Sequence, residues 1–174
     1  MHIPPGTWVH WFDGTAHTGP TDVTVPAPIG RPALFMRQGA VIPMMASDVD
    51  TLSATDDPAV VDETDRATIV RARAIPAGDA AAAGVSVHES AAALTVTFAP
   101  TAPVDELRIE IDLRHRANPS STVSAVTRAT GDALTRADAP AALSAGCRDC
   151  WNYDPTTGWL RVNVRGAATL SVTP

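Results

Sequence analysis

The sequence predicts an all-β fold, an antiparallel β-sandwich of two small lobes. Short runs rich in Val, Thr, Ile and aromatic residues recur along the 174 residues, and turn-forming Gly, Pro, Asn and Asp separate them. The segment 105–116 alternates apolar and charged residues, as a strand with one buried face does. The Ala-rich segments 78–84 and 137–146 are weak helix candidates, because each is short and bounded or broken by Gly or Pro.

The N-terminal strands are predicted from β-branched and aromatic runs. Residues 7–12 (TWVHWF) lead into an Asp-Gly turn, and residues 22–28 (DVTVPAP) alternate until prolines end the run. Two short apolar runs follow at 33–38 and 40–44, with one glycine between them. Residues 67–76 (ATIVRARAIP) then alternate again, which favours a strand with one buried face.

The C-terminal strands continue the same pattern. Residues 84–89 and 93–100 are typical of a hairpin pair, and the strongest hairpin signal is WNYDPTTGWLRVNV, in which Asp154, Pro155 and Gly158 form the turn. The predicted strands of this half are 84–89, 93–100, 105–116, 121–128, 151–154, 158–164 and 168–174.

Composition excludes several classes of function. The formal charge is −6, and the 13 basic residues are all arginines scattered along the chain, so we expect no nucleic-acid partner. No apolar run is long enough for a membrane-spanning helix, and no secretory signal is recognisable, so we expect no membrane partner; the compartment is not indicated. No phosphate-binding loop is found, and we expect no cofactor.

The cysteines and histidines do not form a recognisable metal site. Cys147 and Cys150 form one C-x-x-C, which supplies half of a four-ligand zinc site, so we interpret them as two loop thiols or a local disulfide. His10 and His17 flank the Asp-Gly turn without clear further ligands, and we interpret them as surface histidines of a hairpin. The acidic segment 47–66 is interpreted as a solvated loop, with a calcium site as the alternative.

The first quarter of the chain resembles a known family. Residues 3–44 are similar to the segment that follows the catalytic barrel in glycoside hydrolase family 31, the α-glucosidase and α-xylosidase family. The resemblance depends on the order and spacing of many elements, ending in the pattern Pro-x-Phe-x-Arg-x-Gly-x-Ile-Pro. The matched residues are Pro5, Gly6, Trp8, Trp11, Gly14, Gly19, Pro28, Pro32, Phe35, Arg37, Gly39, Ile42 and Pro43.

The resemblance implies two non-catalytic units. Residues 1–78 would be a proximal β-sandwich segment that lacks its upstream strands, with the acidic loop at about 47–66, and residues 79–174 would be a distal β-sandwich. The partner would be an upstream (β/α)₈ barrel of the same parent chain, carrying an Asp nucleophile and an Asp acid/base. Missing strands would leave sheet edges exposed, which predicts a homodimer through those edges.

We do not expect the chain alone to be catalytic, although the resemblance implies that its parent is an α-glucosidase-like hydrolase. Retaining glycoside hydrolysis needs two carboxyl groups about 5 Å apart, one of them with a raised pKa. The candidates Asp13, Asp22, Glu89 and Asp154 are predicted at turns or strand ends, where carboxylates face water. A barrel takes about 250 residues, which this chain does not have. No catalytic, cofactor-binding or metal-binding residue is therefore assigned.

Four tryptophans are the candidate carbohydrate-binding residues: Trp8, Trp11, Trp151 and Trp159. Sugars stack their C–H faces on flat aromatic rings; the alternative is that these rings fill the core or a contact between domains. The leading hypothesis is a non-catalytic C-terminal region of a family-31-like α-glycosidase that braces the barrel and contributes to binding an oligo- or polysaccharide. The alternatives are a stand-alone carbohydrate-binding module and a structural or interaction sandwich without a sugar ligand.

Overall fold

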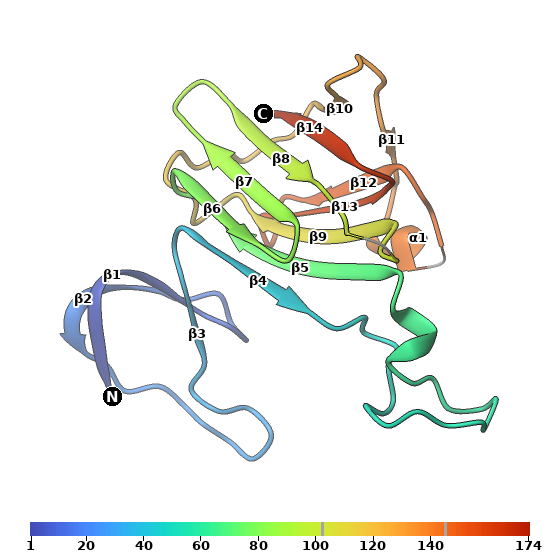
Figure 1. Cartoon of the computed structure of the whole chain (residues 1–174). Helices are drawn as coiled ribbons and strands as arrows, with labels where there is room; N and C mark the ends of the chain where they lie inside the picture. The colour runs from blue at the N-terminus through green and yellow to red at the C-terminus, as the bar shows by residue number, and fades with distance from the viewer. Residues whose placement is uncertain (102, 145) are drawn as a thin grey trace.

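The computed structural model describes residues 1–101, 103–144 and 146–174 and is almost entirely β-structure. Two facing sheets form a sandwich (Figure 1), confirming the predicted fold class. A smaller sheet at the N-terminal end, drawn in blue, lies beside the sandwich, and a long excursion between β4 and β5 extends away from it. Among the described residues, no helix has the length and apolar character needed to cross a membrane.

The N-terminal sheet has three strands in the order β2-β1-β3. They are β1 (His2–His10), β2 (Ala16–Asp22) and β3 (Phe35–Arg37), and all pairings are antiparallel. A register shift between Ile3 and Gly6 lets β1 remain paired through its two prolines. Val9 and Met36 of this sheet are buried against Ile75 of the sandwich, so the small sheet shares a hydrophobic cluster with the larger unit.

One layer of the sandwich is a six-stranded sheet in the order β11-β12-β13-β9-β5-β4. Two of its pairings, β5 with β9 and β11 with β12, are parallel, so the sheet is mixed rather than wholly antiparallel as predicted. The chain leaves β5, crosses to the other layer and returns at β9, which is the long connection that a parallel pair requires. The strands are β4 (Ala40–Met44), β5 (Ile69–Ile75), β9 (Glu106–Asp112), β11 (Thr135–Arg136), β12 (Cys150–Asp154) and β13 (Trp159–Arg165).

The other layer is a five-stranded antiparallel sheet in the order β10-β14-β8-β7-β6. Between the layers lies the main core, to which Leu107, Ile109 and Ile111 of β9 each contribute a side chain at most 1% exposed. The alternation predicted for 105–116 therefore places its apolar face in the core. The strands are β6 (Asp79–Ala82), β7 (Val85–Glu89), β8 (Leu94–Phe98), β10 (Ala125–Arg128) and β14 (Ala168–Thr173).

Two local predictions differ from the structure. No strand forms at 23–28, although the sequence predicts one at 22–28. The strand β2 lies just before this segment and ends at Asp22, and the prolines at 26 and 28 cannot donate ladder hydrogen bonds. The weak helix candidate 78–84 is the strand β6, paired with β7 through a turn at Ala83 and Gly84, both at positive φ. The candidate 137–146 does contain a short helix, α1 (Pro140–Ser144).

The sheets do not divide at the boundary expected between residues 78 and 79. β4 and β5 belong to the same sheet as β9 and β13, since β5 pairs with β9 along six residue pairs. Hydrogen bonding across that boundary makes residues 40–174 one sandwich, to which the sheet of residues 2–37 is attached.

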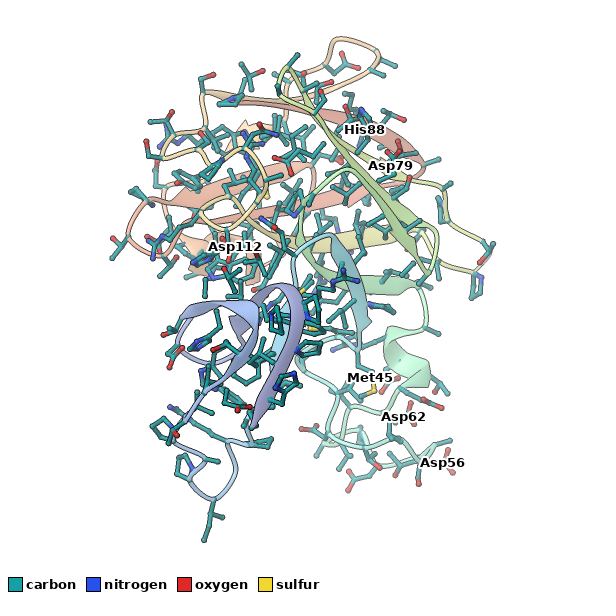
Figure 2. The ribbon with its side chains drawn as sticks, turned by 90° about the vertical axis from the view of Figure 1, so that its left-hand side faces the viewer. Met45, Asp56, Asp62, Asp79, His88 and Asp112 are labelled. Carbon is teal, nitrogen blue, oxygen red and sulfur yellow. A yellow bond between two sulfur atoms is a disulfide. The ribbon has the colours of Figure 1, made fainter. Side chains whose placement is uncertain are left out.

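The acidic excursion is organised around one buried carboxylate. Asp62 is 3% exposed and accepts hydrogen bonds from the backbone N–H groups of Thr55 and Thr64, at 2.7 and 2.8 Å, and from the Thr64 hydroxyl. The Thr64 hydroxyl bond, followed by these backbone bonds, lowers the pKa of Asp62 to about 2. Asp62 thus supports the loop, while Asp56 lies at its outer end (Figure 2).

Candidate functional site

A cleft of about 460 Å³ lies where the N-terminal sheet meets the outer face of the six-stranded sheet. Its walls come from five parts of the chain: the end of β1 with the turn after it, β3, β5, the end of β9 with the loop after it, and the β12–β13 hairpin. Asp112, at the end of β9, marks this junction in Figure 2. The cleft exists because both units are present, since neither sheet alone supplies more than part of its lining.

The outer face of the six-stranded sheet carries a row of charges. Strand register places Glu110 of β9 directly between Arg73 of β5 and Arg161 of β13. Arg73 donates two hydrogen bonds to Glu110 Oε2, at 2.6 and 3.0 Å, and Arg161 Nε lies 3.4 Å from Oε1. Burial raises the pKa of Glu110, but hydrogen bonding by Arg73 and the charges of Arg73, Arg71 and Arg161 outweigh it, so its pKa is lowered and it stays ionised.

Two aromatic rings enclose the Arg73 guanidinium. Its central carbon lies 4.0 Å from the ring centroid of Trp11 and 4.8 Å from that of Trp159, which are cation–π distances. Trp11 follows β1 and Trp159 begins β13, so Arg73 joins the N-terminal sheet to the sandwich. Because Glu110 fixes the guanidinium, both rings are held in place along one wall of the cleft. We call Trp11, Arg73 and Trp159 the aromatic clamp.

Two His–Asp pairs lie at the cleft. His115 Nδ1 is 2.7 Å from Asp112 Oδ2, and Asp112 is 1% exposed. His10 Nδ1 is 2.8 Å from Asp13 Oδ1, although the angle is not that of a directed hydrogen bond. The Thr15 backbone N–H and then His10 lower the pKa of Asp13 to about 2. Both carboxylates are therefore acceptors.

The junction is also closed by hydrogen bonding. Gln38, which follows β3, donates from Nε2 to the backbone carbonyl of His115 at 2.7 Å. Arg114, in the same loop as His115, donates to the backbone carbonyl of Thr156 in the β12–β13 turn. These contacts hold the loop after β9 from the N-terminal unit and from the β12–β13 hairpin.

Three buried polar atoms of the lining residues have no hydrogen-bond partner among the described residues. They are Nδ1 and Nε2 of His10, whose residue is 5% exposed, and Nη1 of Arg161. An unmade hydrogen bond on a buried polar group costs about 1–3 kcal/mol. A hydroxyl group that reached one of these atoms would lower that cost.

The structure brings two of the four predicted tryptophans together. Trp11 and Trp159 are both partly exposed at the cleft, whereas Trp8 lies elsewhere on β1 and donates from Nε1 to the Pro4 carbonyl at 3.0 Å. Trp151 is 2% exposed and donates to the Leu134 carbonyl, so its ring belongs to the core and is not available as a binding platform.

Sequence reasoning missed Arg73 and the Asp112–His115 pair. Arg73 is one of several polar positions in an alternating run, and nothing local distinguishes it from its neighbours. The short spacing of Asp112 and His115 in DLRH was a local signal for a hydrogen-bonded pair, but its place at the cleft depends on β5 and β13 lying beside β9.

The residues considered for acid–base or metal chemistry are engaged in local structure. Glu89 is 5% exposed and accepts backbone hydrogen bonds from Ala117 and Asn118. Asp154 accepts from Thr156 and Thr157 of its own turn, with the Thr157 hydroxyl as the largest cause of its lowered pKa. Within 1–101, 103–144 and 146–174, no group of three or more His, Cys, Asp or Glu residues is arranged to hold a metal ion. Cys147 and Cys150 are joined as a disulfide.

No family model and no curated protein matches the sequence. Solved structures share the fold over nearly the whole chain. A cycloalternan-forming enzyme from Listeria monocytogenes, in complex with a pentasaccharide substrate, matches 99% of this chain with a TM-score of 0.73 and 21% identity. A GH31 dextranase from Flavobacterium johnsoniae, complexed with isomaltotriose, matches 100% with a TM-score of 0.70 and 15% identity. An α-1,4-glucan lyase from Gracilariopsis lemaneiformis matches 99% with a TM-score of 0.63 and 16% identity.

The match covers a small part of each of those proteins. This chain spans 16% of the Listeria enzyme, 24% of the dextranase and 20% of the lyase. Its fold is therefore that of a region within GH31-type glycosidases, in agreement with the resemblance of residues 3–44.

Proposed function

We propose that this chain is the non-catalytic C-terminal β-sandwich region of a family-31-like α-glycosidase and that it braces the catalytic barrel. The observation that carries the proposal is the difference in coverage: 99–100% of this chain corresponds to 16–24% of the similar enzymes. A region of that share is too small to hold a (β/α)₈ barrel, which takes about 250 residues. The region would supply burial and rigidity to a neighbouring unit.

The carboxylates support a role outside the chemistry. A general acid in glycoside hydrolysis needs a raised pKa. Asp13 and Asp154 have lowered pKa values because hydrogen bonds within their own turns stabilise the charged form. Glu89 is committed to holding the segment after β9 through backbone hydrogen bonds. These residues shape loops, which is the role expected in a supporting domain.

The surface of this chain that contacts the catalytic barrel would include the segment between β2 and β3. This segment exposes apolar side chains at Ile29, which is fully exposed, and at Leu34, which is 44% exposed. Phe12, in the turn after β1, is 41% exposed nearby in the same N-terminal unit. Exposed apolar residues grouped in one unit are typical of a contact with another domain.

The test is the size and activity of the native protein. An antibody raised against residues 1–174 should detect a polypeptide several times larger than 18.1 kDa in the source organism, and the immunoprecipitate should hydrolyse p-nitrophenyl α-glucoside. The isolated chain should show no hydrolysis of the same substrate. A native band at 18.1 kDa, or hydrolysis by the purified chain, would overturn the proposal.

A second candidate is a carbohydrate-binding module. The observation that favours it is the cleft that carries Trp11 and Trp159. The similar enzymes have been solved with a pentasaccharide and with isomaltotriose, so α-linked glucose oligomers are the first ligands to test. This candidate would replace the first if the native chain has no barrel. An interaction sandwich without a sugar ligand is the remaining alternative.

A further inference from the structure

We propose that the cleft beside the aromatic clamp is a binding site for an uncharged oligosaccharide. The proposal deepens the function above and rests on its carbohydrate-binding part, because it names the site and the chemical class of the ligand. Its volume of about 460 Å³ falls within the range of about 300–1,000 Å³ that is usual for small-molecule sites. Its lining includes both aromatic or apolar side chains and charged or hydroxyl-bearing ones, which suits a pyranose ring with C–H faces and hydroxyl edges.

The apolar contact would come from the aromatic clamp. The Arg73 guanidinium lies over the rings of Trp11 and Trp159, and both residues are partly exposed and line the cleft. Rings held by a fixed guanidinium lose little conformational freedom when a ligand arrives, which lowers the entropic cost of binding. Each indole also carries an N–H group that can donate to a hydroxyl.

The charges of the cleft favour a neutral ligand. Its lining carries the three arginines Arg73, Arg114 and Arg161 and the two carboxylates Asp13 and Asp112, and Glu110 lies behind it in contact with Arg73 and Arg161. Each carboxylate already has a nitrogen partner within the protein: His10 for Asp13, His115 for Asp112, and Arg73 for Glu110. Arg73 and Arg161 already contact Glu110, and Arg114 already donates to the Thr156 carbonyl, so a sugar carboxylate would compete with these contacts, whereas hydroxyl groups can bond to the remaining lone pairs and N–H groups.

Two unmade hydrogen bonds point to a ligand independently of the rings. Nε2 of His10 and Nη1 of Arg161 are buried and without partners among the residues that the structure describes, and both residues line this cleft. His10 stands on the N-terminal unit and Arg161 on the sandwich. A hydroxyl group can pair with either kind of atom, since it donates and accepts.

The experiment is a titration of the full chain followed by ¹H–¹⁵N NMR, in which the four indole N–H signals act as internal probes. The probes are isomaltotriose, maltotriose and xylotriose, with trigalacturonate as the charged control. The indole signals of Trp11 and Trp159 should shift with saturation for a neutral trisaccharide. Those of Trp8 and Trp151, which donate to Pro4 and Leu134, should not move.

Variants give a second readout by calorimetry. Trp159→Ala should weaken binding by at least about tenfold, because it removes one ring of the wall. Trp8→Phe is the matched control and should leave the affinity within about twofold, since Trp8 lies outside the cleft. Circular dichroism must first show that each variant is folded; the NMR titration of the unmodified chain decides the question if Trp159→Ala does not fold.

Three outcomes would overturn the inference: no saturable shift with any neutral trisaccharide, shifts confined to Trp8 or Trp151, or tighter binding of trigalacturonate. These outcomes are distinct from failure of the proposed function. A large, active native enzyme whose region binds no sugar leaves the bracing role intact. A native chain of 18.1 kDa that binds sugar in this cleft refutes the bracing role and keeps the site.

Discussion

Arg73 and Glu110 face each other on the parallel strands β5 and β9, with Arg73 Nη2 lying 2.6 Å from Glu110 Oε2. The pair holds the guanidinium in the one position from which it contacts both Trp11 and Trp159. A charge pair on the outer face of a sheet is thereby part of the link between two structural units.

Glu110→Gln is expected to destabilise the protein by about 1–3 kcal/mol at pH 7, because three arginines lose their shared carboxylate. The pKa of Glu110 is lowered below its ordinary value of 4.5, so its contribution is complete above that value and is lost as the pH falls through the lowered pKa. Urea unfolding between pH 7 and pH 3 measures this. The difference between wild type and Glu110→Gln should shrink on acidification.

Glu63→Gln is the control for that series, since Glu63 is exposed. It should follow the wild type at every pH. If Glu110→Gln differs from the wild type equally at pH 7 and pH 3, the charge of Glu110 does not stabilise the fold.

Trp11→Ala is expected to loosen the N-terminal sheet while the sandwich stays folded. Trp11 packs on the cluster of Val9, Met36 and Ile75 and contacts Arg73, so its loss weakens the main apolar contact between the units. Trypsin cleavage after Arg37 in β3 should accelerate by roughly tenfold, as expected when the free energy of local unfolding of this sheet falls by about 1.4 kcal/mol. Leu52→Ala, at a side chain 62% exposed on the distant excursion, should leave cleavage at Arg37 unchanged. Equal rates in the Trp11→Ala variant and the wild type would refute this role.

Gly158→Ala tests the hairpin that carries Trp159. Gly158 has φ +77°, and an added Cβ would lie 2.8 Å from Cβ of Arg114. Gly166→Ala is the matched control, with φ +67° and open space around the added atom. Both should lose stability through backbone strain, and Gly158→Ala should lose about 1–3 kcal/mol more through the clash. Thermal unfolding compares them, and equal losses would mean that the Arg114 loop moves aside freely.

Self-association through a sheet edge remains a prediction. β2 is an outer strand of the three-stranded sheet, with one side unpaired. Size-exclusion chromatography over a dilution series should show a dimer that dissociates, and Thr18→Arg on β2 should shift the equilibrium to monomer because a charge opposes edge pairing. Pro20 and Asp22 on the same strand oppose edge pairing. A monomer at every concentration would contradict the expectation of a dimer.

The strand content was predictable because burial of one sheet face imposes a two-residue period. Segment 105–116 shows this directly: its apolar positions are core residues of β9, and Glu110 faces outward. Segment 78–84 shows the limit. Its alanines suit a helix by propensity, but the edge of β7 offers hydrogen bonds that a short isolated helix cannot match.

The all-β class, most of the strands and the family resemblance of residues 3–44 could all be inferred from the amino-acid sequence. It also singled out Trp11 and Trp159, but only as two of four equivalent rings. The tertiary structure decided that these two share a cleft, that Trp151 lies in the core, and that Arg73 and Glu110 connect the units. Periodicity along the chain shows only which way a side chain points from its own strand. The cleft depends on contacts between residues far apart in the sequence, through the strand order β13-β9-β5 and the docking of the N-terminal sheet against these strands.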